Sequence, residues 1–380
     1  MEDTKSSGAL TWIVVALIII GGIFFFTRSG NAPEATGPIK IGFIGPLSGD
    51  AAMYGEVVRN GVILAAKELN AKGGINGRPV NIIYEDGKCN GKDSSSAAQK
   101  LINVDTVKFI VDGDCSGAIL GAASIFEQAK VLVLAAIATN PKIADAGDYI
   151  FRNAPNDSAR GVLLADYAKS LYKKAAVITE QTDYAQGIKN TFTEQAKSNG
   201  LEVAVSEDYV TGSNDFRTSL SKIKAANPDV VLINPQTGAD FVRIAKQARQ
   251  LGIKAPFIGA EFNGPEVLEA GAAVEGTVIA IAPGLSADGK GKTYLDAYKA
   301  EFGKEPAYAY YSGAGYDDLM IIADGISKAG YDTAKVKDYL YSLPKYSGVI
   351  GDYSFDKNGD VVGIKFLFTK IIGGKFVDQK

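Results

Sequence analysis

Residues 109–141 constrain the fold of this chain most strongly, because apolar runs and a helix-like segment alternate along them. An apolar run at residues 109–111 ends in a polar turn, and a helix-like segment follows at residues 118–129. A second apolar run occupies residues 131–136. The order strand, polar turn, helix, strand is typical of an open parallel sheet. We therefore predict an α/β fold in which helices flank mainly parallel sheets.

Polar residues follow both of these predicted strands. Ser116 comes after the first strand, and Thr139 comes after the second, directly before an Asn-Pro pair that favours the start of a helix. Ligands of open parallel sheets bind at the carboxyl ends of the strands, where helix N-termini offer unpaired N–H groups. Both residue types are also common helix N-caps, which is an alternative reason for their positions. Their placement at neighbouring strand ends predicts a shared site for an anion or a zwitterion.

The composition excludes several classes of function. The length of 380 residues predicts two lobes of ordinary size. With 40 basic and 43 acidic residues, the chain lacks the positive excess of a nucleic-acid-binding protein. It contains no histidine, which excludes Ser-His-Asp, Cys-His and HExxH sites. The first turn, GFIGPLSG, is not a dinucleotide fingerprint, and no Walker A motif is present, so we expect neither an enzyme nor a cofactor.

The chain contains two cysteines, Cys89 and Cys115. Each follows an apolar run, at residues 80–84 and 109–111, that we assign to strands of one sheet. Two free buried thiols are one possibility, and a disulfide is favoured if the chain is exported. Such a disulfide would close a loop of roughly 25 residues, contribute about 3 kcal/mol in the chain-entropy model, and fix the loop that carries Ser116.

The N-terminal segment contains an uncharged apolar run at residues 10–26, close to the lower length limit for a membrane-spanning helix. A cleaved signal peptide is the alternative. Against it, Glu2 and Asp3 replace a positive n-region, and three Phe residues end the run where small residues precede a cleavage site. We expect residues 1–28 to be a membrane anchor or signal segment, with an uncleaved anchor favoured. Residues 29–37 form a polar linker, and the rest of the chain lies outside the cytoplasm.

The alternation of strands and helices restarts after residue 157, which predicts a second α/β lobe of four or more strands. Its predicted loops contain Tyr184, Gln236 and Glu261 as candidate ligand contacts. Each of them is equally compatible with an ordinary exposed loop residue.

The segment Asp-Lys-Asn-Gly-Asp at residues 356–360 resembles the opening of a calcium-binding loop. The twelfth position from its start is Leu367 rather than the required Glu. We therefore predict a hairpin turn between residues 353–355 and 361–365, and no metal site.

Several longer motifs occur in a distinctive order. They are IGPLSGDAAMYGEVVRNGVILAAKELNAKGGINGRPV at 44–80, ATNP at 138–141, DYAQG at 183–187, IGAEFNG at 258–264 and VIGDYSFDKNGD at 349–360. Together with the two cysteines, which match the single disulfide of the family, they make residues 38–380 resemble the periplasmic-type binding proteins for leucine, isoleucine and valine. These proteins are type I solute-binding components of ABC transporters.

The resemblance implies a two-lobed, periplasmic-binding-protein-like type I fold, preceded here by one N-terminal transmembrane helix. Lobe 1 would comprise residues 38–157 and 283–345, and lobe 2 residues 158–282 and 346–380. The three crossings between the lobes would form a hinge, and the lobes would close on a ligand in the cleft between them.

The resemblance also implies roles for the polar candidates. Ser116 and Thr139 would hold the α-carboxylate of an amino acid. The carbonyl of Ala138, the hydroxyl of Thr139 and the carboxylate of Glu261 would hold its α-ammonium group. A carboxylate that faces an ammonium group in a closed cleft contributes a few kcal/mol.

The walls of the implied pocket show departures from the family pattern. Tyr54, Tyr184 and Tyr311 would surround the ligand side chain, with Tyr54 standing where close relatives have Trp. Gln236 lies in a polar segment where relatives place an aromatic residue, and Ile137 replaces a small residue and narrows the pocket.

These features predict a solute-binding protein that captures an amino acid, branched-chain or similarly apolar, and delivers it to an ABC permease and its ATPase subunits. We expect a monomer that is tethered to the membrane and binds no nucleic acid. The alternatives are a ligand-sensing ectodomain, a binder of an amide, urea or an aromatic acid, and an enzyme with the same fold.

Overall fold

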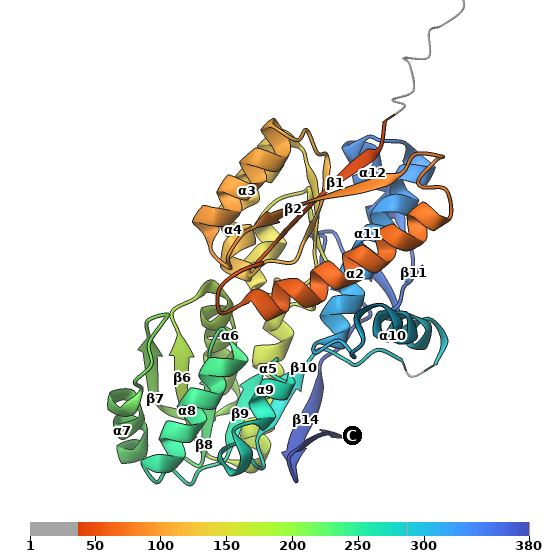
Figure 1. Ribbon diagram of the computed structural model, residues 1–380. Helices are drawn as coiled ribbons and strands as arrows, with labels where there is room; N and C mark the ends of the chain where they lie inside the picture. The colour runs from red at the N-terminus through yellow and green to blue at the C-terminus, as the bar shows by residue number, and fades with distance from the viewer. Residues whose placement is uncertain (1–36, 287, 380) are drawn as a thin grey trace, which may run out of the picture. The chain divides into compact units, whose positions relative to one another are not determined.

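The computed structural model describes residues 37–286 and 288–379 (Figure 1). From Ile39 onward the chain forms one compact unit, which contains two larger sheets. The strands of the first sheet are all parallel and run in the order β2-β1-β3-β4-β5. Their bounds are β1 (Ile39–Gly45), β2 (Val80–Asp86), β3 (Phe109–Asp112), β4 (Leu132–Ala135) and β5 (Ile150–Arg152). The predicted parallel α/β fold is confirmed.

Helices cover both faces of the first sheet. On one face lie α3 (Gly91–Asn103) and α4 (Ser116–Ala129), and on the other α2 (Ala52–Ala71) and α11 (Ala309–Ala329) (Figure 1). All residues of β3 and β4 are therefore buried, which explains their continuous apolar runs. A 3₁₀ turn, η1 (Pro141–Asp145), stands where the Asn-Pro pair predicted a helix start.

The second sheet is mixed and runs in the order β15-β14-β10-β9-β8-β6-β7. Its parallel strands are β6 (Lys174–Glu180), β7 (Glu202–Tyr209), β8 (Val230–Asn234), β9 (Phe257–Ala260) and β10 (Val278–Ile281), and β14 (Leu367–Ile372) and β15 (Lys375–Gln379) add an antiparallel edge. The intervening helices are α5 (Asp157–Leu171), α6 (Asp183–Asn199), α7 (Arg217–Ala226), α8 (Gly238–Gln250), α9 (Pro265–Leu268) and the 3₁₀ turn η2 (Gly271–Ala273). This confirms the second α/β region.

The C-terminal part of the chain packs against the first sheet and adds strands to the second. After α10 (Gly289–Phe302), α11 and α12 (Thr333–Ser342), the short strands β11 (Tyr346–Ser347), β12 (Asp352–Phe355) and β13 (Val361–Val362) form a small antiparallel sheet. The predicted hairpin is confirmed, although its second strand is shorter than predicted. Tyr353 and Phe355 pack into the core beside the first sheet, whereas β14 pairs with the second. The lobe boundaries stay a prediction.

A buried ion pair joins this hairpin to the first sheet. Arg152, at the end of β5, is fully buried, and its guanidinium donates to both carboxylate oxygens of Asp360 at 2.5 and 2.8 Å. The same guanidinium donates to the carbonyl oxygen of Asn140 at 2.7 Å. The pair therefore also holds the turn that follows β4.

The predicted membrane anchor at residues 1–28 and nearly all of the linker lie outside the described residues. Among the helices of residues 37–286 and 288–379, none has the length and apolar character needed to cross a membrane.

Asp317, on α11, is buried beside the first sheet. Its carboxylate accepts hydrogen bonds from the backbone N–H groups of Val349 (2.9 Å) and Ile350 (3.1 Å). Burial raises the pKa of Asp317 from 3.8 to about 7, although these two hydrogen bonds lower it. Burial likewise raises the pKa of the neighbouring Asp318.

We expect the protein to lose stability as the pH rises from 3.8 to about 7. The folded state holds a proton on Asp317 more tightly than the unfolded chain does. The stabilisation that this proton gives is therefore complete below pH 3.8, the pKa in the unfolded chain. It is lost as the pH rises past about 7, the pKa in the folded protein. Denaturant unfolding at pH 5 and pH 8 checks the expectation, and Asp317→Asn should make the dependence shallower. A wild-type protein that is more stable at pH 8 would contradict it.

Candidate functional site

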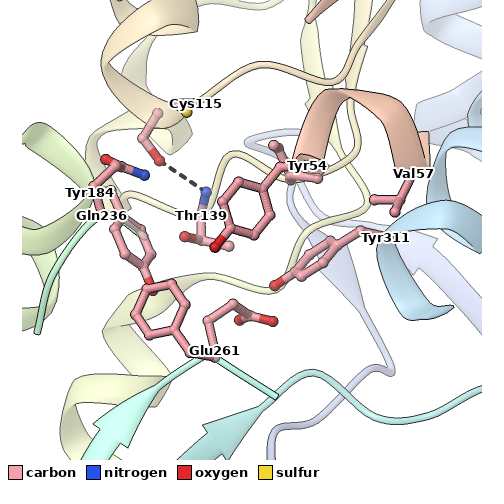
Figure 2. Close-up of a pocket in the computed structure, with 11 residues that line it drawn as sticks. Tyr54, Val57, Cys115, Thr139, Tyr184, Gln236, Glu261 and Tyr311 are labelled. Atoms are coloured by element: carbon pink, nitrogen blue, oxygen red, sulfur yellow. Dashed lines mark hydrogen bonds between the residues drawn. The ribbon is translucent and has the colours of Figure 1, made fainter. Parts of the chain in front are cut away.

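A cavity lies between the carboxyl ends of the strands of the two sheets (Figure 2). The centre of a water molecule can occupy a volume of about 40 Å³ inside this cavity. Its lining residues are Tyr54, Val57, Cys115, Ser116, Ile137, Thr139, Tyr184, Gln236, Glu261, Phe262 and Tyr311. The structure thus brings together seven of the eight candidate ligand contacts. Ala138, the eighth, is buried and is not among the lining residues.

Ser116 is the first residue of α4, directly after β3. Its hydroxyl oxygen accepts hydrogen bonds from the backbone N–H groups of Thr139 and Asn140, both at 3.1 Å. Because these bonds occupy the oxygen, the hydroxyl proton is left to donate to another group. Ser116 is not an N-cap, since Cys115 holds that position.

Thr139 follows β4, and its hydroxyl donates to the buried carboxylate of Asp157 at 2.5 Å. An ionised carboxylate only accepts hydrogen bonds, so the proton of this pair comes from Thr139. The Thr139 oxygen can therefore accept a hydrogen bond from a ligand. Asn140 rather than Thr139 caps η1, with its side chain accepting from Lys142 N–H. The N-cap explanation thus fails for both predicted residues.

Glu261 follows β9 on the second sheet and is buried. Its φ is +68°, a left-handed conformation that non-glycine residues seldom adopt and that clusters at functional sites. Burial raises the pKa of Glu261, and the nearby Arg160 guanidinium opposes this shift.

Tyr184 lies in the first turn of α6, so its assignment to a loop was wrong. That turn is capped by Thr182, whose hydroxyl accepts from Ala185 N–H. The helix begins at Asp183, within the segment that was predicted as a loop, and this directs the Tyr184 side chain toward the cavity (Figure 2).

Arg160, in the first turn of α5, lies beside the cavity and was missed by the sequence analysis, as were Asp157 and the lining residues Val57 and Phe262. Its guanidinium is fully buried, forms an ion pair with Glu261, and lies 3.1 Å from a carboxylate oxygen of Asp157. It also donates to the hydroxyl oxygens of Tyr184 and Tyr311, both at 3.4 Å. A sequence signal existed, because Arg160 shares a helix face with the buried Leu164 and Ala168, and a buried arginine requires a partner.

Direct contacts join the two sheet edges around the cavity. The backbone N–H of Gly238, at the start of α8, donates to the Tyr54 hydroxyl oxygen on α2 at 3.0 Å. The Asn140 side chain donates to the carbonyl oxygen of Asp183. Burial raises the pKa values of Tyr54, Tyr184 and Tyr311, so their hydroxyls stay neutral. These two hydrogen bonds therefore connect the two sheet edges beside the cavity.

The predicted disulfide between Cys89 and Cys115 is present. It connects the turn after β2 to the N-cap of α4, one residue before Ser116. Asp114 reinforces this link, because one of its carboxylate oxygens accepts from the backbone N–H groups of both cysteines at 3.0 and 2.8 Å.

We expect Cys89→Ser together with Cys115→Ser to lower the free energy of unfolding by about 3 kcal/mol, because the unfolded chain regains the entropy of the closed loop. Binding at Ser116 should weaken as well, since the N-terminus of α4 loses a covalent anchor. Denaturant unfolding measures the loss, and a reduced wild-type sample serves as the control. Equal stability of the double variant and the oxidised wild type would contradict this role.

Two helix-flanked sheets with a cavity between their carboxyl edges, lined by apolar side chains and a few polar groups, are the architecture of a binding protein with two α/β halves. The chain belongs to the periplasmic binding protein family, whose sequence pattern it matches over residues 38–375.

Named relatives support this assignment. A leucine-, isoleucine-, valine-, threonine- and alanine-binding protein of Pseudomonas aeruginosa is 32% identical over 371 residues, which cover 95% of each chain. A leucine binding protein from Thermotoga maritima has a TM-score of 0.83 at 27% identity, with 90% of this chain and 98% of that chain covered. A branched-chain amino acid transporter substrate binding protein from Streptococcus pneumoniae, in complex with isoleucine, has a TM-score of 0.80 at 28% identity, covering 90% of this chain and 100% of that chain. The predicted family is confirmed.

Proposed function

We propose that this chain is an extracytoplasmic solute-binding protein. It captures an α-amino acid with a branched or similarly apolar side chain and delivers it to the permease of an ABC transporter. One observation carries this proposal: a hydrogen-bond donor, Ser116, and two acceptors, Thr139 and Glu261, face one cavity. The names of the relatives, which specify leucine, isoleucine and valine, support the choice of ligand.

The polar groups match the two charged ends of an amino acid. The Ser116 hydroxyl and the N-terminus of α4 suit a carboxylate, because both offer hydrogen-bond donors. The Thr139 oxygen and the Glu261 carboxylate suit an ammonium group, because both accept. Ser116 and Thr139 come from the first sheet and Glu261 comes from the second, so one zwitterion would bridge the two sheets.

The remaining walls suit an aliphatic side chain. Val57, Ile137 and Phe262 line the cavity together with the rings of Tyr54 and Tyr311. Apolar walls with a few oriented polar groups are typical of small-ligand sites.

Ligand entry requires the two sheet edges to separate. The present cavity holds about three water molecules, given that one needs roughly 10–15 Å³ of such space. A branched-chain amino acid is larger. We therefore propose a hinge at the three chain crossings between lobes 38–157 with 283–345 and 158–282 with 346–380, and closure on the ligand.

The same proposal includes the remaining expectations. The protein is a monomer without catalytic activity, works outside the cytoplasm, and is tethered through residues 10–26. It binds the permease and depends on its ATPase subunits.

A thermal-shift screen of the full-length protein against common amino acids, simple amides, urea and aromatic acids tests the ligand class. A bound ligand well above its dissociation constant raises the melting temperature through mass action. We expect leucine, isoleucine or valine to stabilise the protein most. Stabilisation by amides or aromatic acids alone would favour the alternative ligand class, and no response to any compound would refute the binding function.

A further inference from the structure

The most unusual group near the cavity is the guanidinium of Arg160. We propose that Arg160 is a positioning residue: it keeps the carboxylates of Asp157 and Glu261 ionised together, so that the site presents one net negative charge to one ligand ammonium group. This inference rests on the proposed amino-acid function and adds a charge requirement to it.

The position of Arg160 fits this role. It lies in the first turn of α5, where the chain passes from the first sheet to the second. The guanidinium lies between Asp157, which holds the Thr139 hydroxyl, and Glu261 at the end of β9. The ring of Phe366, just before β14, covers it at 4.2 Å from the guanidinium carbon to the ring centroid. Arg160 therefore contacts one proposed ammonium acceptor, Glu261, directly. It is linked to the other, Thr139, through the carboxylate of Asp157.

The charges around Arg160 can be counted. Burial raises the pKa values of Asp157 and Glu261, and the Arg160 guanidinium opposes both shifts. With both carboxylates ionised, they contribute two negative charges and Arg160 one positive charge, which leaves one negative charge. Burial raises the pKa values of the hydroxyls that face the group, so these remain uncharged; they belong to Tyr54, Tyr184, Tyr310 and Tyr311. Arg152 also acts electrostatically on Asp157, but its guanidinium is bound to Asp360. A single ligand ammonium group would neutralise this remaining negative charge.

Removal of Arg160 would change the proton content of the site. Two buried carboxyl groups without a cation cannot both ionise, because burial and mutual repulsion disfavour the charged forms. One of them would then carry a proton at neutral pH. The ligand ammonium group needs an ionised Glu261 as its acceptor, and Thr139 can accept from it only while Asp157 is ionised and takes the Thr139 proton. Contact with both acceptors would therefore require the shared proton to leave, so binding would release a proton.

Titration calorimetry of the full-length protein with leucine tests this inference. Measurements in buffers of different ionisation enthalpy give the number of protons released. At pH 7.5 we expect close to none for the wild type and about one for Arg160→Gln. The affinity of Arg160→Gln should rise with pH, approaching tenfold per pH unit. Arg160→Lys retains the charge and should restore the wild-type proton count. Arg249→Gln removes a partly buried arginine of α8 outside the cavity and should leave the count unchanged.

Each outcome has a distinct meaning. If the wild type binds leucine and Arg160→Gln releases no proton, the role of Arg160 is refuted while the binding function stands. If the wild type binds no amino acid, the proposed function itself fails. If Arg160→Gln does not fold, the wild type decides: the carboxyl carbon of Glu261 should show the NMR shift of an ionised carboxylate at pH 7.5 without ligand, and a protonated shift would overturn the inference.

Discussion

Glu261→Gln is expected to weaken the binding of leucine, isoleucine or valine by about 30-fold or more. The substitution keeps the size of the side chain and removes its charge. Loss of one partner of a buried, charged hydrogen bond costs about 2–5 kcal/mol, and each 1.4 kcal/mol is a tenfold change in affinity. Titration calorimetry at fixed pH measures the change.

The fold should tolerate this substitution, because Arg160 keeps Asp157 as a partner. Glu266→Gln is a matched control: Glu266 follows the same strand, β9, and accepts from Tyr308, but does not line the cavity. We expect it to alter affinity by less than about threefold, an effect well under 1 kcal/mol. Wild-type affinity in folded Glu261→Gln would show that Glu261 does not hold the ammonium group.

Asp360→Ala is expected to lower the free energy of unfolding by about 3–5 kcal/mol, because it leaves the guanidinium of Arg152 buried and unpaired. It should also weaken ligand binding, since Arg152 holds the carbonyl of Asn140 next to Thr139. Denaturant unfolding and calorimetry measure the two effects.

An exposed ion pair beside the same hairpin provides the control. Lys345 pairs with Asp352 at 2.8 Å, and both side chains are more than half exposed. Lys345→Ala should therefore cost at most about 1 kcal/mol. If Asp360→Ala lowers the free energy of unfolding no more than Lys345→Ala does, the buried Arg152–Asp360 pair does not stabilise the fold as its geometry indicates.

The sequence was sufficient to predict most parallel strands of the two sheets, because parallel strands buried on both faces are continuous apolar runs. The short edge strand β5 and the antiparallel edge formed by β14 and β15 were not predicted. The helices that the sequence did not reveal are amphipathic and mostly polar. Neither α3, which contains three consecutive Ser residues, nor α12 was predicted. Both lie on the outside of the first sheet, where a few buried side chains such as Leu101 and Leu340 are enough to hold a helix.

Part of the candidate site could also be predicted. Ser116 and Thr139 follow strands, and the sequence shows where strands end. Two contacts of the site could not be predicted: the hydrogen bond from Thr139 to Asp157 and the ion pair between Arg160 and Glu261. Both depend on how the chain crosses between the sheets. The position of Tyr184 could not be predicted either, because it depends on the residue at which α6 begins after β6.

The central claim is that the cavity holds both charged ends of an amino acid. Titration calorimetry of the full-length protein with leucine, 4-methylpentanoate and 3-methylbutylamine tests it most directly, because the two analogues each lack one of the charged ends. We expect leucine to bind at least 100-fold more tightly than either analogue. Binding of 4-methylpentanoate as tight as that of leucine would contradict the claim, since the ammonium group would then contribute nothing at Glu261.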